Sequence, residues 1–106
     1  MSNPAQEQIH QWVTQNRVVL LMKGTPNAPL CGFSATAAQL LNQNGISDYF
    51  SFDVLSDQEI RQAAKDYAGW PTFPQLYVGG ELIGGCDIMR EMAATGELSA
   101  LLSGKK

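Results

Sequence analysis

The chain has 106 residues, 44% hydrophobic and 16% charged, which is the composition of a globular protein and predicts a single domain over residues 1–106. Its net charge of −3 and its pI near 4.9 argue against nucleic acid and against a polybasic membrane surface as partners. No apolar run reaches the ~18 residues of a membrane span, and the N-terminus lacks the pattern of a targeting peptide, so we expect a cytoplasmic protein.

The first predicted elements are a helix, a strand and a loop. Asn3 followed by Pro4 favours a helix start, and apolar residues then recur at helical spacing to about Asn16. Residues 18–22 form a short continuous apolar run, which predicts a central strand covered on both faces. Residues 23–29 contain two prolines and a glycine, so we expect a loop.

A second helix is predicted from Gly32 to the stop signal at Gly45, and a half-buried strand is predicted over residues 50–54. A capping box that starts at Ser56 predicts a third helix, which ends at Gly69. The apolar stripe of the second helix is predicted to consist of Phe33, Ala37, Leu40 and Leu41.

The last third of the chain predicts an irregular segment, a hairpin and two helical pieces. Residues 70–74 are locked by two prolines, and the apolar runs of residues 76–78 and 82–83 are joined by a two-glycine turn. Residues 84–87 open a helical region that Gly96 interrupts. The expected fold is therefore α/β and thioredoxin-like, with a four-stranded mixed sheet and helices on both faces.

Cys31 is the strongest candidate for chemistry. It lies between a Pro- and Gly-rich loop and the predicted start of a helix, where backbone N–H groups and the helix dipole favour thiolate. Ser34 occupies the position of the second cysteine in a redox pair, so it cannot close a disulfide, although its hydroxyl can donate to the sulfur. Cys86 reads either as a small residue lining a pocket or, less favoured, as a disulfide partner.

Two further segments could recognise a ligand. The Gly84 to Asp87 stretch can seat an α-amino acid head, because a helix N-terminus accepts a carboxylate and Asp87 accepts an ammonium group; Asp87 could instead only cap the helix. Thr72 to Pro74 could hold a cis proline that turns the Phe73 backbone toward an extended peptide, or could form only a rigid turn.

Lone charges and the one histidine are weaker candidates. Lys23 and Arg61 could clamp a second carboxylate, but each could equally be a solvated surface charge. His10 lies in the first predicted helix, far in sequence from Cys31, so a catalytic role is not expected.

Four segments together resemble the monothiol glutaredoxins of the Cys-Gly-Phe-Ser type. They are Lys23 to Pro26, Cys31 to Ser34, Trp70 to Tyr77 and Gly84 to Ile88. The likeness covers nearly the whole chain and is closest to the short bacterial form, which implies a single glutaredoxin domain with a thioredoxin-like fold.

The resemblance implies that glutathione lies along one groove. Lys23 and Arg61 would hold its glycine carboxylate. The Phe73 backbone would pair with its cysteinyl part, and Cys86 and Asp87 would hold its γ-glutamyl end. The full implied set is Lys23, Cys31, Phe33, Arg61, Thr72, Phe73, Pro74, Gly85, Cys86 and Asp87.

The resemblance also implies a role in binding and transferring a 2Fe-2S cluster, with BolA-like proteins and apo iron-sulfur proteins as partners. A cluster needs four ligands, so one Cys31 from each of two chains and two glutathione thiolates would complete it. The expected state is a homodimer when cluster-bound and a possible monomer when apo. The alternative is a glutathione-dependent thiol-disulfide oxidoreductase; residues 24–28, an insertion that dithiol relatives generally lack, favour the carrier.

Overall fold

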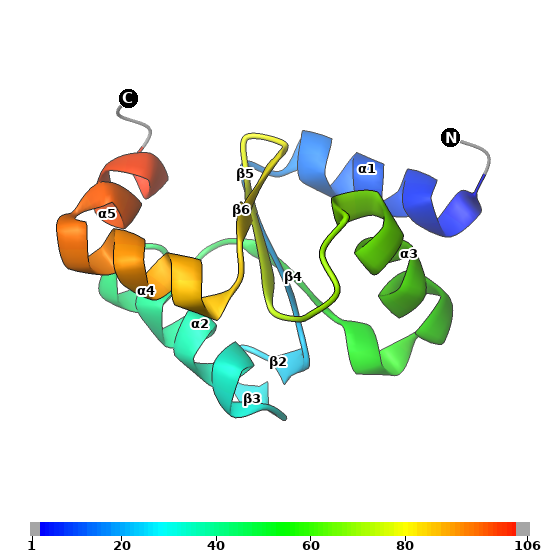
Figure 1. The fold of residues 1–106 in the computed structure, drawn as a ribbon, viewed down its shortest axis with the longest axis horizontal. Coiled ribbons are helices and arrows are strands. Elements are labelled where there is room, and N and C mark those ends of the chain that lie inside the picture. Colours follow the sequence, from blue (N-terminus) through cyan, green and yellow to red (C-terminus); the bar gives the residue numbers. More distant parts are fainter. Residues whose placement is uncertain (1–2, 104–106) are drawn as a thin grey trace.

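A four-stranded mixed sheet forms the centre of the computed structural model, which describes residues 3–103 (Figure 1). The strand order is β4-β1-β5-β6; β1 and β4 are parallel, and the other two pairs are antiparallel. This confirms the predicted mixed sheet. The strands are β1 (Val18–Met22), β4 (Phe50–Asp53), β5 (Gln75–Val78) and β6 (Glu81–Gly84).

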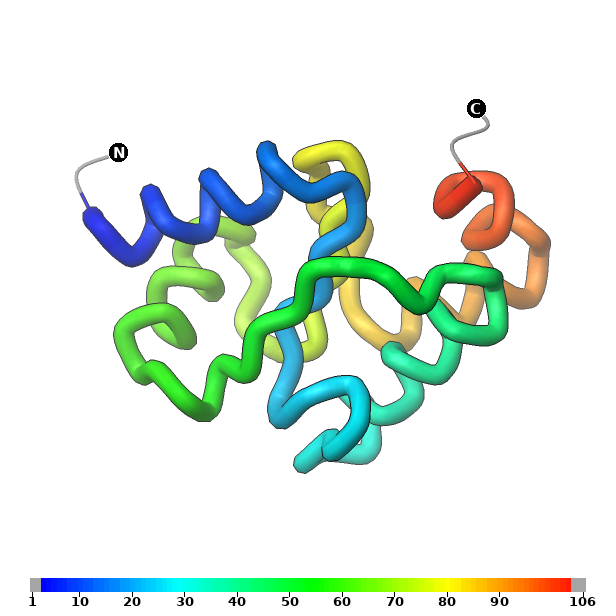
Figure 2. Tube along the Cα trace, turned by 180° about the vertical axis from the view of Figure 1, so that it is seen from behind, coloured from blue at the N-terminus to red at the C-terminus, as the bar shows by residue number. Residues whose placement is uncertain are grey.

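Helices cover both faces of the sheet, as the sequence predicts. Helices α1 (Pro4–Gln15) and α3 (Gln58–Ala68) pack together on one face. Helix α2 (Gly32–Gln43) packs on α4 (Cys86–Thr95), and α4 on α5 (Glu97–Leu102), over the other face. The view from behind shows the same division into two helical groups (Figure 2). None of the helices within residues 3–103 is long and apolar enough to cross a membrane.

The alternation of side chains along β1 explains why its sequence is apolar throughout. Val18, Leu20 and Met22 belong to the core beneath α2, α4 and α5, whereas Val19 and Leu21 belong to the core beneath α1 and α3. All five side chains are buried, which confirms a central strand covered on both faces.

Helix starts follow capping rules, with one correction. The Asn3 side chain accepts hydrogen bonds from the N–H groups of Ala5 and Gln6, as expected for a cap before Pro4. The capping box predicted from Ser56 does not form, because the helix starts one residue later. Asp57 is the cap of α3, because its carboxylate accepts from the N–H groups of the second and third helical residues.

The stretch from Lys23 to Pro29, predicted as a loop, is instead a small ribbon. Its strands β2 (Gly24–Thr25) and β3 (Ala28–Pro29) pair with each other, and the Leu30 N–H donates to the Lys23 carbonyl at 3.0 Å. Gly24 has φ +90, and a Cβ there would lie 2.6 Å from the Ala28 carbonyl oxygen. Only glycine therefore fits this ribbon without strain.

Two other predictions are wrong in detail. Phe33 is not in the core stripe of α2, because its side chain is 57% exposed at the rim of a groove. Strand β4 ends at Asp53 rather than at Val54, since Val54 starts the short 3-10 helix η1 (Val54–Ser56). The Asp53 carboxylate ends the strand by accepting from the N–H of Leu55, and it also accepts from the N–H of Gly24.

Candidate functional site

A groove of about 530 Å³ crosses the molecule between α3, the segment 70–74 and the starts of α2 and α4. Every residue predicted for the site from the sequence lines this groove. Four other residues also line the groove and were not predicted from the sequence; they are Lys65, Trp70, Pro71 and Ile88. Lys65 could have been predicted as a lining residue, because it lies one helical turn after Arg61 on the same face of the helix.

Cys31 is the cap residue of α2 and is partly exposed at the groove. The backbone N–H of Ser34 is the largest cause that lowers the pKa of Cys31; partial burial opposes it, and the N–H of Phe33 and the charge of Lys23 add to the lowering. A thiol at this helix terminus therefore ionises more readily than an ordinary cysteine.

Ser34 is fully buried and has a structural role that the sequence analysis did not predict. Its Oγ accepts a hydrogen bond from the Lys23 N–H at 3.0 Å, which fixes the first turn of α2 against the end of β1. Its hydroxyl also contributes to the lowered pKa of Cys31, as the sequence analysis expected. Ser34 thus places Lys23 and Cys31 together.

Cys86 and Asp87 begin α4 on the other side of the groove. Cys86 is a free, buried thiol, and burial raises its pKa. Asp87 does not cap α4, because Gly85 is the cap residue and no side chain bonds to the helix start. The Asp87 side chain is 88% exposed and lines the groove, and its Oδ1 lies 3.6 Å from Arg90 Nη1.

The segment before β5 forms the wall between these two sides. The Phe73–Pro74 peptide bond is cis, which confirms the isomer considered from the sequence. Within residues 3–103, the N–H and C=O of Phe73 make no backbone hydrogen bond. Gly85 lies against this wall, and a Cβ there would be 3.2 Å from the Pro74 carbonyl oxygen.

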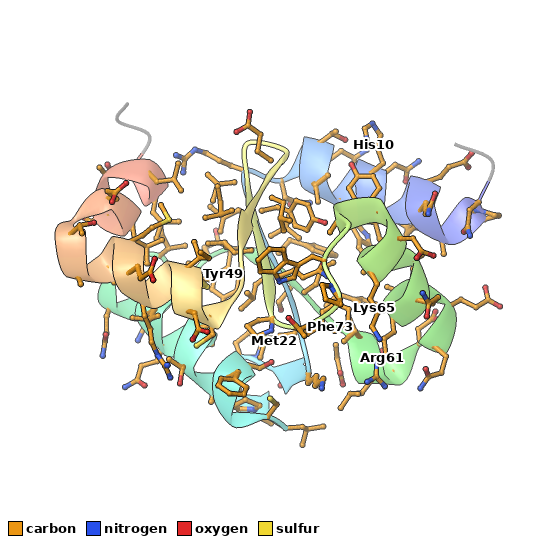
Figure 3. All side chains as sticks on the ribbon, in the orientation of Figure 1. His10, Met22, Tyr49, Arg61, Lys65 and Phe73 are labelled. Atoms are coloured by element: carbon orange, nitrogen blue, oxygen red, sulfur yellow. The ribbon has the colours of Figure 1, made fainter. Side chains whose placement is uncertain are left out.

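Positive charge collects on one side of the groove although the chain is acidic. Lys23, Arg61 and Lys65 all line it, and Figure 3 shows Arg61 and Lys65 projecting from α3 near Phe73. Arg61 Nε is buried and has no hydrogen-bond partner within residues 3–103, and the Arg61 side chain lines the groove beside Lys65. Asp87 is the acidic residue of the lining, so the groove suits a ligand with anionic and cationic ends.

The structure gives less support for catalysis by histidine or for a metal site made of side chains alone. His10 is an exposed residue of α1 whose Nδ1 lies 2.9 Å from the Tyr67 hydroxyl, and it is not part of the groove lining. Among the described residues, no group of three or more His, Cys, Asp or Glu side chains is placed to hold a metal ion.

The fold and the cysteine define the class: a thioredoxin-like protein with one thiol of lowered pKa at a helix start. The glutaredoxin family profile matches residues 18–83. The chain is 49% identical over 102 residues to a monothiol glutaredoxin, ycf64-like, of Synechocystis, with 96% of this chain and 94% of the relative covered. The chain therefore belongs to the glutaredoxins, and several of its relatives are named monothiol glutaredoxins.

Other comparisons agree on the fold and differ in length. The solution structure of reduced poplar apo GrxS14 matches with a TM-score of 0.80 and 42% identity, covering 93% of this chain and 90% of that one. The crystal structure of a buckwheat glutaredoxin–glutathione complex matches with a TM-score of 0.82 and 27% identity, covering 94% and 88%. Rice Monothiol glutaredoxin-S11 is 50% identical over 98 residues, which are 92% of this chain; the chain spans only 20% of its length.

Proposed function

We propose that this chain binds glutathione in the groove and carries a 2Fe-2S cluster between two copies of itself. The observation that carries the proposal is the placement of one acidified, partly exposed thiol beside a groove with cations on one side and a carboxylate on the other. Residues 1–106 would act as one domain.

Glutathione fits this groove by charge and by shape. Its glycine carboxylate would meet Lys23 and Arg61, and its backbone would pair with the free N–H and C=O of Phe73. Its γ-glutamyl ammonium would meet Asp87, beside the free N–H groups at the start of α4. The buckwheat relative crystallised with glutathione supports this ligand.

The cluster is the cargo, and the donor set decides how it would be held. One chain offers one suitable thiolate, because Cys86 is buried and its pKa is raised. Four ligands are therefore reached with Cys31 from two chains and with two glutathione thiolates. Since the glutathione ligands can dissociate, such a cluster can be passed to an acceptor.

A second function uses the same thiol. The Cys31 thiolate would attack the glutathione sulfur of a mixed disulfide, release the protein thiolate and leave a Cys31–glutathione disulfide. A second glutathione thiolate would then release oxidised glutathione and restore Cys31. The lowered pKa of Cys31 favours this oxidoreductase activity.

Partners and location follow from the carrier proposal. BolA-like proteins and apo iron-sulfur proteins would receive the cluster or share it, and nucleic acid and membranes would not be partners of this acidic chain. Two free cysteines suit a reducing compartment, so a cytoplasmic location is proposed.

Anaerobic reconstitution with iron, sulfide and glutathione tests the carrier function. The expected product is a red-brown dimer that requires glutathione, is abolished by Cys31→Ser and is retained by Cys86→Ser. A colourless monomer with rapid deglutathionylating activity would favour the oxidoreductase. Loss of the cluster in Cys86→Ser would contradict the ligand set.

A further inference from the structure

A buried amide supports the groove wall from inside. Gln75 is the first residue of β5, pairs with Leu21 of the central strand and is 0% exposed. Tyr77, two residues on and therefore on the same face of β5, packs into the core beneath α1 and α3. A buried position on this face would ordinarily hold an apolar residue, so the polar side chain needs a reason.

The reason lies in two carbonyl groups of the wall. Gln75 Nε2 donates to the Trp70 carbonyl oxygen at 3.0 Å and to the Thr72 carbonyl oxygen at 3.3 Å. Both carbonyls belong to the segment that separates α3 from β5 and lines the groove. One side chain therefore turns two carbonyls of this segment toward the interior.

The same two bonds hold the chain immediately before the residue whose backbone faces the ligand in the proposed function. Phe73 follows Thr72 directly, and its N–H and C=O make no backbone hydrogen bond within residues 3–103. Without a donor at position 75, the two carbonyls would lose these hydrogen bonds. The segment would then no longer be held against β5, and the Phe73 backbone would lose its fixed direction.

We propose that Gln75 is a positioning residue for glutathione: it holds the Trp70–Thr72 carbonyls inward so that the Phe73 backbone can pair with the tripeptide. The inference rests on the proposed function, since it takes the groove ligand to be glutathione. Gln75 itself touches no ligand, because its side chain lies behind the wall.

The test compares Gln75→Met, which keeps the length of the side chain and removes its donors, with the wild-type chain. The dissociation constant for glutathione, measured by calorimetry well below the unfolding temperature, should rise about tenfold, the loss expected when hydrogen bonds that orient the site are broken. The iodoacetamide reaction rate of Cys31 should stay within about twofold, because the causes that lower the pKa of Cys31 lie in α2 and at Lys23.

Tyr77→Phe is the matched control. It changes a buried polar residue on the same face of the same strand, but the hydroxyl that it removes has no hydrogen-bond partner within residues 3–103. Its glutathione affinity should equal that of the wild type. An equal loss in both variants would show a general effect of disturbing β5 and would overturn the inference.

Gln75→Leu and the wild-type chain itself keep the inference testable if Gln75→Met does not fold. The Leu side chain has no donor for either carbonyl, so its glutathione affinity should also fall. In the wild type, the Gln75 side-chain NH₂ protons should be protected from hydrogen exchange, and their NMR chemical shifts should change on glutathione binding. If the wild type binds glutathione but these protons exchange freely, or if both variants bind as tightly as it does, Gln75 has no positioning role. A wild type that binds no glutathione would refute the proposed function instead.

Discussion

At the scale of single residues, the protonation state of the Cys31 sulfur decides which reactions it can undergo. Backbone N–H groups of the first helical turn and the charge of Lys23 stabilise the thiolate, whereas burial disfavours the thiolate of Cys86. The two cysteines of one groove are therefore chemically different, although both are free.

Alkylation measures this difference. Because the pKa of Cys31 is lowered in the folded chain, its iodoacetamide rate should rise at a lower pH in the folded protein than in the same protein unfolded in urea. Cys86 should react only at higher pH, since its pKa is raised. Cys31→Ser isolates Cys86, and equal rate profiles for folded and unfolded Cys31 would contradict the account.

Substitutions of Lys23 and Arg61 should separate the effect on glutathione binding from the effect on Cys31 ionisation. Lys23→Gln removes a charge that both faces the groove and lowers the pKa of Cys31, so it should weaken glutathione binding and shift the alkylation profile to higher pH. Arg61→Gln should weaken binding by a similar factor, roughly tenfold, without that shift. Calorimetry and alkylation on both variants check this; a shifted profile in Arg61→Gln would show that Arg61 also acts on the thiol.

At the scale of elements, the β2–β3 ribbon positions Cys31 at the groove. The ribbon is tied at its base by the Leu30 N–H bond to the Lys23 carbonyl, and it is tied to β4 by the Asp53 carboxylate. It therefore fixes the chain immediately before the thiol.

Gly24→Ala should break this ribbon. The new Cβ would meet backbone atoms at 2.6 Å in a left-handed conformation, so we expect a loss of about 3 kcal/mol or more in the free energy of unfolding, measured in urea. Gly45→Ala is the control, because Gly45 has φ +86 with nothing within 4 Å, and it should cost only about 1 kcal/mol. Equal costs would mean that the close approach in the ribbon is not tight.

The parts of the fold that local chemistry decides could be predicted from the sequence. The apolar run of β1, the two-glycine turn and the Gly69 stop of α3 are examples. The ribbon could not be predicted, because it depends on a hydrogen bond that the Gly24 N–H donates to the carboxylate of Asp53, 29 residues away. The exposed position of Phe33 was missed for the same kind of reason, since helical spacing does not tell which part of a stripe passes beyond the core.

The groove lining could be predicted from the sequence, whereas the contacts that support it could not. The resemblance implies a set of residues for the proposed ligand, and these residues lie together in the groove. The supporting contacts of Ser34 and Gln75 join segments whose proximity only the fold establishes. In the sequence, Ser34 stands where a redox pair would have its second cysteine. In the structure, its side chain also holds the end of β1 in place.

At the scale of the whole molecule, the positive charge of the groove and its one readily ionised thiol both favour glutathione as the ligand. The acidic chain places Lys23, Arg61 and Lys65 around one groove, which would steer an anionic tripeptide toward Cys31. The groove contains one thiol that ionises readily, so a cluster with four ligands would have to be assembled from two chains and two glutathione molecules.

Native mass spectrometry of the protein reconstituted anaerobically with iron, sulfide and glutathione tests this stoichiometry most directly. The expected complex contains two chains, one 2Fe-2S cluster and two glutathione molecules, and it should dissociate to apo monomers when glutathione is removed. A cluster held by one chain, or by two chains without glutathione, would contradict this stoichiometry.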